Sequence, residues 1–163
     1  MKVDFNTILT IISFICMIAS IIGAVRANTY AKKAKALLNR DTVKASLGLV
    51  LEMKSYVDCI RNYKNPALET KPPRGQNIAN MINEQVSLLK RQFDKMINDL
   101  PPKYENILTC ASINQTEISK TIAHMLSNSE EVLNENLDKI ETYFLSLEKE
   151  LKKADEQETN ILN

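Results

Sequence analysis

The sequence is poor in the residues on which most catalytic and metal sites depend. Its 163 residues include one histidine, three cysteines and no tryptophan. It contains no Cys-x-x-Cys pair, no zinc-type Cys/His spacing, no glycine-rich phosphate loop, and neither a G-x-S-x-G nor an H-E-x-x-H motif. We therefore expect a protein that is not an enzyme and that has no metal or cofactor site.

Glycine and proline are also scarce, which favours helices. There are three glycines, and the five prolines fall into two clusters, one within residues 65–76 and the other at Pro101-Pro102. Proline has no backbone N–H to donate and interrupts helices, so the two clusters predict loops near 65–76 and 101–103. No segment alternates polar and apolar residues as a strand does, and the expected fold class is all-α.

The first long segment, residues 8–25, carries no charge. As a helix its 18 residues extend roughly 27 Å, close to the ~30 Å thickness of the hydrocarbon core of a bilayer. We expect residues 1–27 to form a short tail and one transmembrane helix, and residues 28–163 to form a helical domain. Five basic residues follow the segment within fifteen positions, so the N-terminus is expected outside and the domain in the cytoplasm, at the cell inner membrane.

A cleaved signal peptide is the alternative interpretation of this segment. Cleavage after Ala27 would release a secreted helical protein, in which Cys59 and Cys110 could form a disulfide. Two features disfavour this alternative. The apolar segment is longer than the usual 7–15 residues of a signal peptide, and the basic residues after it would resist translocation.

Small and polar residues recur along one face of the predicted span. They alternate in steps of three and four: Thr10, Ser13, Met17, Ser20 and Ala24. In lipid, such residues mark contacts between helices, so we expect the spans to associate in a homo-oligomer of four or more copies whose hydroxyl face lines a narrow pore. A second track of small residues overlaps the first: Ala19, Gly23, Ala27 and Ala31. In the simplest alternative, each hydroxyl bonds to a carbonyl one turn back.

Three helices are expected between the span and residue 126. Residues 27–64 continue the span, with a bend at 39–42 and an apolar stripe formed by Val43, Leu47, Val50, Val57 and Ile60. A second helix is predicted over residues 77–99. A third begins near Lys103, and its apolar face consists of Ile107, Leu108, Ala111, Ile118, Ile122 and Met125.

The last helix has the clearest pattern. A capping box at Ser127-Asn128-Ser129-Glu130 predicts its start. Three heptads then follow, formed by Leu133, Leu137, Ile140, Phe144, Leu147, Leu151 and Ala154. Heptads fit a coiled coil between protomers, but the short connections favour an antiparallel bundle within one chain, with a coiled-coil-like last helix. The last nine residues are polar and expected to fray.

Charge is distributed unevenly along the chain. Residues 26–103 contain 15 basic and 7 acidic residues, whereas residues 128–163 contain 4 basic and 10 acidic ones. We expect the basic part to lie against anionic lipid headgroups and the acidic last helix to face the basic helices.

A sharper hypothesis concerns the basic residues around the proline-rich loop, which are Arg61, Lys64, Lys71 and Arg74. In an oligomer these side chains could hold an anionic ligand such as a nucleotide or an oligonucleotide, with Tyr56 and Tyr63 available to stack on bases. A solvated loop explains the same residues without a ligand.

The order of segments resembles the small single-span effector subunits of bacterial antiphage defence systems. The features that carry the resemblance are the span at 8–25, the basic stop at 26–35 and the helical domain up to Asn163. It implies a membrane-anchored homo-oligomer that forms or gates a lesion or pore, with the cytoplasmic domain as sensor or regulator of a partner-protein or nucleotide signal. The alternative function is a passive single-span tether that presents a helical bundle to a cytoplasmic partner protein.

Overall fold

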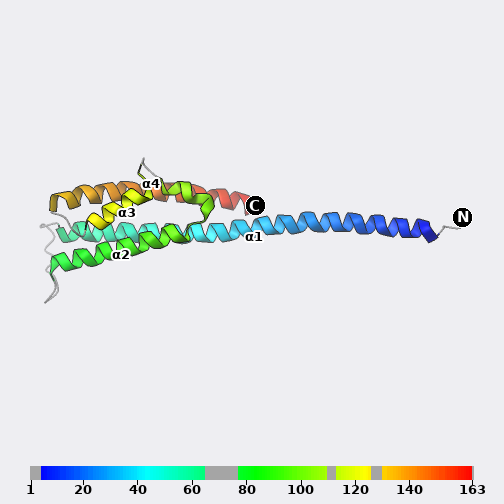
Figure 1. Cartoon of the computed structure of the whole chain (residues 1–163), viewed down its shortest axis with the longest axis horizontal. Coiled ribbons are helices and arrows are strands. Elements are labelled where there is room, and N and C mark those ends of the chain that lie inside the picture. Colours follow the sequence, from blue (N-terminus) through cyan, green and yellow to red (C-terminus); the bar gives the residue numbers. More distant parts are fainter. Residues whose placement is uncertain (1–4, 65–76, 110–112, 126–129, 163) are drawn as a thin grey trace.

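The computed structural model of the chain is shown in Figure 1 and describes residues 5–64, 77–109, 113–125 and 130–162. Its elements in those ranges are α1 (Phe5–Lys64), α2 (Ile78–Asp99), the 3₁₀ helix η1 (Pro102–Leu108), α3 (Gln115–His124) and α4 (Glu130–Leu162). The all-α expectation is therefore confirmed for these residues. The proline-rich loop 65–76 and most of the predicted capping box before α4 lie outside them.

The first helix, α1, is continuous over its 60 residues and is about 90 Å long. The bend that the sequence predicts at 39–42 is wrong. Asn39 and Arg40 reach across to α4, and Thr42 Oγ1 donates to the Leu38 carbonyl oxygen one turn back at 3.0 Å. The helix is therefore continuous through residues 39–42.

The second half of α1 packs between α2 and α4, which both run back along it in the opposite direction (Figure 1). The apolar stripe predicted for residues 43–60 supplies the α1 side of the buried contact, with Leu47 only partly buried and Met53 as an unpredicted member. The buried residues are Val43, Val50, Met53, Val57 and Ile60 on α1, and Val86, Leu89, Phe93 and Met96 on α2. We call the packed residues from Ala36 onward the helical domain.

All seven heptad residues predicted for α4 are buried. At the centre of the domain, Phe93 of α2 meets Tyr143 and Phe144 of α4, with ring centroids 6.0 and 6.2 Å apart. Edge-on and tilted ring contacts of this kind add to the free energy of burying apolar surface. The aromatic cluster therefore fixes how α4 sits against α2.

The predicted third helix is in fact two elements. The 3₁₀ helix η1 ends at Leu108, and α3 begins after Asn114, whose side chain accepts a hydrogen bond from the Glu117 backbone N–H at 2.8 Å. Asn114 is thus a helix N-cap, with Glu117 three residues later as in a capping box. Leu108, Ile118 and the other predicted apolar residues that are described still contribute to the core, while Ala111 lies outside the described residues.

The end of α4 also departs from the prediction. The helix continues to Leu162 rather than fraying over its last nine residues. Lys33 Nζ donates to the Leu162 carbonyl oxygen at 3.0 Å, which satisfies one of the carbonyls that a helix end leaves unpaired. Contacts with α1 therefore keep the polar end of α4 helical, although its own sequence predicts fraying.

Tyr143 provides a test of this packing, because its buried hydroxyl donates to the Leu108 carbonyl oxygen at 2.7 Å and joins α4 to η1. Replacing Tyr143 with Phe should lower the free energy of unfolding by about 1–3 kcal/mol, since a buried carbonyl loses its donor. Denaturant titration of the full chain in mild detergent, followed by circular dichroism, measures the change. Tyr30→Phe, at a side chain that is 71% exposed, is the control and should have no effect.

Candidate functional site

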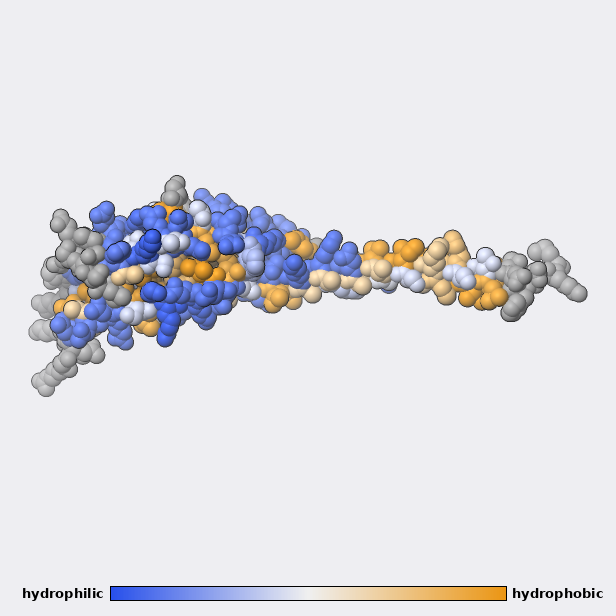
Figure 2. Space-filling model, in the orientation of Figure 1, coloured by the Kyte–Doolittle hydropathy of each residue, from blue (hydrophilic) through white to orange (hydrophobic). Residues whose placement is uncertain are grey.

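The end of α1 that precedes the helical domain is not covered by any other described part of the chain. All side chains described from Leu9 to Lys35 are exposed, and Figure 2 shows this part as a largely apolar rod that extends from a hydrophilic domain. Its large apolar residues are 41–62% exposed: Leu9, Ile11, Ile12, Phe14, Ile15, Met17, Ile18, Ile21, Ile22 and Val25. Among the described residues, α1 is the one helix long and apolar enough to cross a membrane.

The residues of the predicted span interface lie on this uncovered part. Thr10, Ser13, Met17, Ser20 and Ala24 are all exposed, so no other part of the described chain covers them. Ser20 Oγ donates to the Cys16 carbonyl oxygen at 2.8 Å, one turn back. The donor of that hydroxyl is thus used within the helix, while its oxygen keeps lone pairs that can accept from a neighbouring helix.

Some of the basic residues after the apolar segment contact α4. Lys33 holds the end of α4, and Arg40 pairs with Asp155 at 3.1 Å. Further along, Lys54 pairs with Glu148 at 2.9 Å. The acidic last helix therefore lies against basic α1, which accounts for part of the charge asymmetry of the sequence.

The structure describes two of the four residues in the predicted anionic-ligand site. Arg61 is engaged with α4, where its guanidinium lies 2.7 Å from an Asp138 oxygen and 2.8 Å from a Glu141 oxygen. Lys64 is the last residue of α1. Lys71 and Arg74 lie outside the described residues, so the anionic-ligand site stays a prediction. Within it, Arg61 already pairs with two carboxylates of α4.

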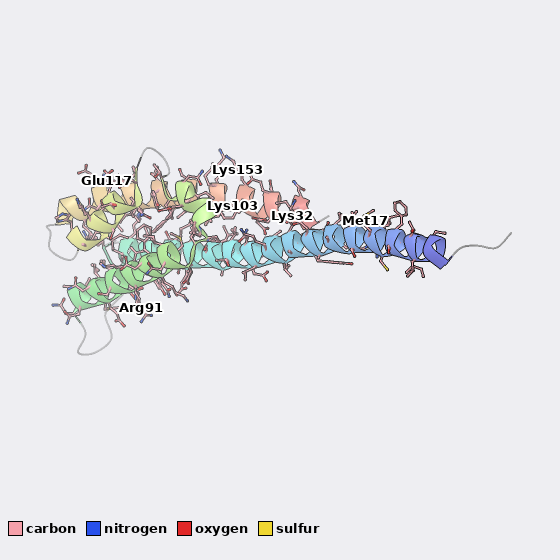
Figure 3. The ribbon with its side chains drawn as sticks, turned by 45° about the vertical axis from the view of Figure 1, so that its right-hand side comes forward. Met17, Lys32, Arg91, Lys103, Glu117 and Lys153 are labelled. Atoms are coloured by element: carbon pink, nitrogen blue, oxygen red, sulfur yellow. The ribbon has the colours of Figure 1, made fainter. Side chains whose placement is uncertain are left out.

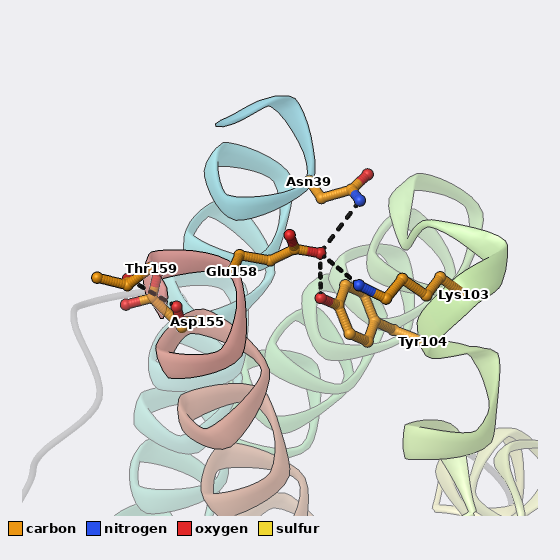
Figure 4. Close-up of polar contacts among 6 residues, drawn as sticks. All are labelled: Asn39, Lys103, Tyr104, Asp155, Glu158 and Thr159. Carbon is orange, nitrogen blue, oxygen red and sulfur yellow. Dashed lines mark hydrogen bonds and ion pairs between the residues drawn. The ribbon is translucent and has the colours of Figure 1, made fainter. Parts of the chain in front are cut away.

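The most concentrated polar contact was not predicted. Glu158 of α4 is 1% exposed, and one of its carboxylate oxygens accepts hydrogen bonds from three side chains, one on α1 and two on η1 (Figure 4). Asn39 Nδ2 of α1 donates at 3.1 Å, Lys103 Nζ of η1 at 2.9 Å, and the hydroxyl of Tyr104 completes the set. We call these four residues the Glu158 cluster.

The surroundings of Glu158 favour its charged form. Burial is the largest influence on its pKa and raises it, but the hydrogen bonds from Tyr104, Lys103 and Asn39 outweigh burial and hold the pKa below its ordinary value of 4.5. Burial, and then the bond to Glu158, raises the pKa of Tyr104. The bond to Glu158 also raises the pKa of Lys103. At neutral pH the cluster is therefore an ion pair braced by two neutral donors.

A sequence signal for Glu158 did exist. Leu151 and Ala154 end the predicted heptads, and the next step of four reaches Glu158, so it occupies a core position of α4. Its partners come from positions 54 to 119 residues away, which local pattern cannot reveal.

The described residues give no support to metal or disulfide chemistry. They contain no group of three or more His, Cys, Asp or Glu side chains placed to hold a metal ion. Cys59 is a free thiol, and Cys110 lies outside the described part of the chain.

The Glu158 cluster predicts a pH dependence of stability. Because the folded-state pKa of Glu158 is lowered, its charge stabilises the fold fully above about pH 4.5, and this contribution is lost as the pH falls through the folded pKa. Glu158→Gln should remove that part of the pH dependence and, at pH 7, lower the free energy of unfolding by about 1.5–3 kcal/mol.

Thermal melts at pH 3–7 measure both effects. The matched control is Glu156→Gln, two residues away on the exposed side of α4, which should melt like the wild type. The residual pH dependence of Glu158→Gln reports other carboxylates, notably Glu148, whose pKa the bonds from Lys152 and Lys54 also lower. Equal melting of both variants would contradict the role of Glu158.

Comparison with known proteins assigns no family to this chain. No protein-family model matches it, and no match was found among curated proteins or solved structures. Its function must therefore be inferred from the uncovered end of α1 and from the contacts that hold α1 in the helical domain.

Proposed function

We propose that this chain is a membrane-anchored homo-oligomeric effector whose spans form or gate a lesion or pore, in bacterial antiphage defence. In this proposal α1 crosses the inner membrane with its N-terminus outside, and the helical domain is an antiparallel bundle in the cytoplasm. One observation carries the proposal: the uncovered apolar end of α1 continues without a break into the buried part of the same helix.

The case for a membrane starts from surface area. Ten large apolar side chains between Leu9 and Val25 are each about half exposed, and apolar surface in water costs roughly 25 cal/mol per Å². A bilayer removes this cost over a length that matches its hydrocarbon core. The basic residues that follow then favour the cytoplasmic side.

The case for association rests on the face that contains Ser13 and Ser20. A single span has no partner within its own chain, so contacts in the membrane must come from lipid or from other copies. Small side chains allow backbones to approach closely, and hydroxyl oxygens accept bonds across the contact. Four or more such faces around one axis would leave a narrow polar path.

The proposed regulation of the spans rests on the continuity of α1 and on its contacts with α4. Among the described residues, four ion pairs join α1 to α4: Arg40–Asp155, Lys54–Glu148, Arg61–Asp138 and Arg61–Glu141. A signal that changes how α4 sits on α1, whether from a partner protein or from a nucleotide or oligonucleotide, would act directly on the helix that continues into the membrane. The helical domain is thus proposed to hold the spans in a closed arrangement until such a signal arrives.

A passive tether for a cytoplasmic partner protein is the second candidate function. The observation that favours it is the Ser20 hydroxyl, which already donates within its own helix to Cys16. If the other hydroxyls of the span do the same, the seam gives no strong contact between copies. In a tether, an unrelated apolar span would replace residues 8–25 without loss of function.

We predict that Ser13→Leu combined with Ser20→Leu abolishes membrane permeabilisation and leaves insertion intact. The added side chains block close approach and remove the hydroxyls, while the span becomes more apolar. Leakage of K⁺ from liposomes that contain the full chain should fall at least tenfold. Extraction at alkaline pH checks that the variant is still integral to the membrane.

The control adds the same bulk on the second track of small residues, with Ala19→Leu and Gly23→Leu. Nothing lies within 4 Å of a Cβ placed at Gly23, so the protomer tolerates this change. The control should leak like the wild type. Leakage that survives in the Ser13/Ser20 variant and disappears in the control would assign the contact to the second track instead.

Native mass spectrometry of the full chain in mild detergent separates the two candidate functions before any leakage assay. We expect a discrete complex of four or more copies. An intact monomer at all concentrations would favour the tether. Loss of the first 27 residues from the measured mass would show that the apolar segment is a cleaved signal peptide.

A further inference from the structure

A groove opens at the end of the helical domain from which α1 extends toward the proposed membrane. Its volume is about 290 Å³, and three helices line it. Lys32, Lys35 and Ala36 come from α1, Lys103 from η1, and Glu158 and Ile161 from α4. Figure 3 labels Lys32 and Lys103 on adjacent elements at this end of the domain.

The groove carries uncompensated positive charge. Lys103 is neutralised by Glu158, which lies 2.9 Å away and belongs to the same groove. Lys32 and Lys35 are exposed, and no carboxylate in the described part of the chain forms an ion pair with either. Being three residues apart on a helix, they lie on the same side of α1. Two ammonium groups are therefore free to bind an anion at the groove.

The groove also lies at the depth of lipid headgroups, if residues 8–25 span the bilayer. Lys32 follows Val25 by seven residues, or about 10 Å along the helix, and Lys35 by about 15 Å. The headgroup layer is roughly 5–8 Å thick on each side, and a lysine side chain can extend its ammonium about 6 Å back toward it. Tyr30, 71% exposed between Val25 and Lys32, suits the same interface.

We propose that this groove binds the phosphate headgroup of an anionic glycerophospholipid from the membrane in which α1 is anchored. Lys32 and Lys35 donate to the non-bridging phosphate oxygens. The Lys103–Glu158 pair forms a neutral polar wall, and Ala36 with Ile161 contacts the glycerol carbons. The inference rests on the proposed membrane function and adds to it a ligand for the helical domain.

The lining favours a lipid over a free nucleotide. None of the residues that line the groove is aromatic, so a base would have no ring to stack on. The ring of Tyr104 lies nearby but is already covered by Lys103 Nζ, 5.0 Å from its centroid. A headgroup needs only the phosphate contacts, and its acyl chains stay in the bilayer beside α1.

The test is lipid binding to the full chain in mild detergent, followed by native mass spectrometry with phosphatidylglycerol or phosphatidylcholine at equal concentrations. We expect tighter binding of phosphatidylglycerol. A lysine near an anionic surface is worth on the order of 1 kcal/mol, or about fivefold in affinity, so Lys32→Gln with Lys35→Gln should weaken binding roughly 25-fold.

The matched control is Lys44→Gln with Lys95→Gln, which removes the same charge from exposed lysines that do not line the groove. It should bind phosphatidylglycerol like the wild type. Equal binding of the two lipids, or equal loss in both double variants, would overturn the proposal. Displacement of phosphatidylglycerol by glycerol phosphate or ADP at matching concentration would instead identify a site for free anions and also overturn it.

Membrane extraction keeps this result separate from the proposed function. If alkaline washing releases the wild-type chain from membranes, the proposal of a membrane span fails, and the groove proposal fails with it. If the chain stays integral and shows no preference for phosphatidylglycerol, only the groove proposal fails.

Discussion

One constraint governs the molecule: α1 is a single helix whose two parts require different surroundings. From Leu9 to Val25 its side chains are mostly apolar and uncovered, whereas from Ala36 onward one face is buried against α2 and α4. A continuous backbone ladder joins the two parts, so neither can turn about the helix axis independently of the other. Any contact that sets the rotation of α1 in the domain also sets the rotation of its uncovered apolar part.

The contact that sets this rotation most firmly is apolar, with one polar cluster at its end. The ion pairs along α1 and α4 are partly exposed and typically contribute less than about 1 kcal/mol each. The burial of Val50, Met53 and Ile60 contributes more, because each side chain leaves water entirely. The Glu158 cluster then fixes the last turn of contact, where α1 leaves the domain and where an unpaired buried carboxylate would be costly.

The sequence predicted what depends on local periodicity and missed what depends on distant partners. The heptads of α4 and the approximate bounds of α2 follow from apolar spacing, and the structure confirms both. The bend at 39–42 and the frayed end of α4 were wrong because Asn39 and Glu158 satisfy each other across 119 residues. The proposed span face rests on the same kind of spacing and stays a prediction, whereas the groove could not be predicted, since Lys103 and Glu158 reach it from separate elements.

Helix geometry allows both proposed contacts of α1 to form at once. Ala31, the last residue of the second track, lies within about 20° of Ser20 and Ala24 around the helix axis and is exposed, whereas Ala36 is the first described residue that the helical domain buries. The five-residue step from Ala31 to Ala36 rotates the side-chain direction by about 140°, at roughly 100° per residue. At the junction, the helical domain therefore does not cover the side of α1 that carries the proposed span contacts. In the proposed oligomer, neighbouring copies can approach along that side without displacing α4. A domain placed on the same side would have kept the spans apart.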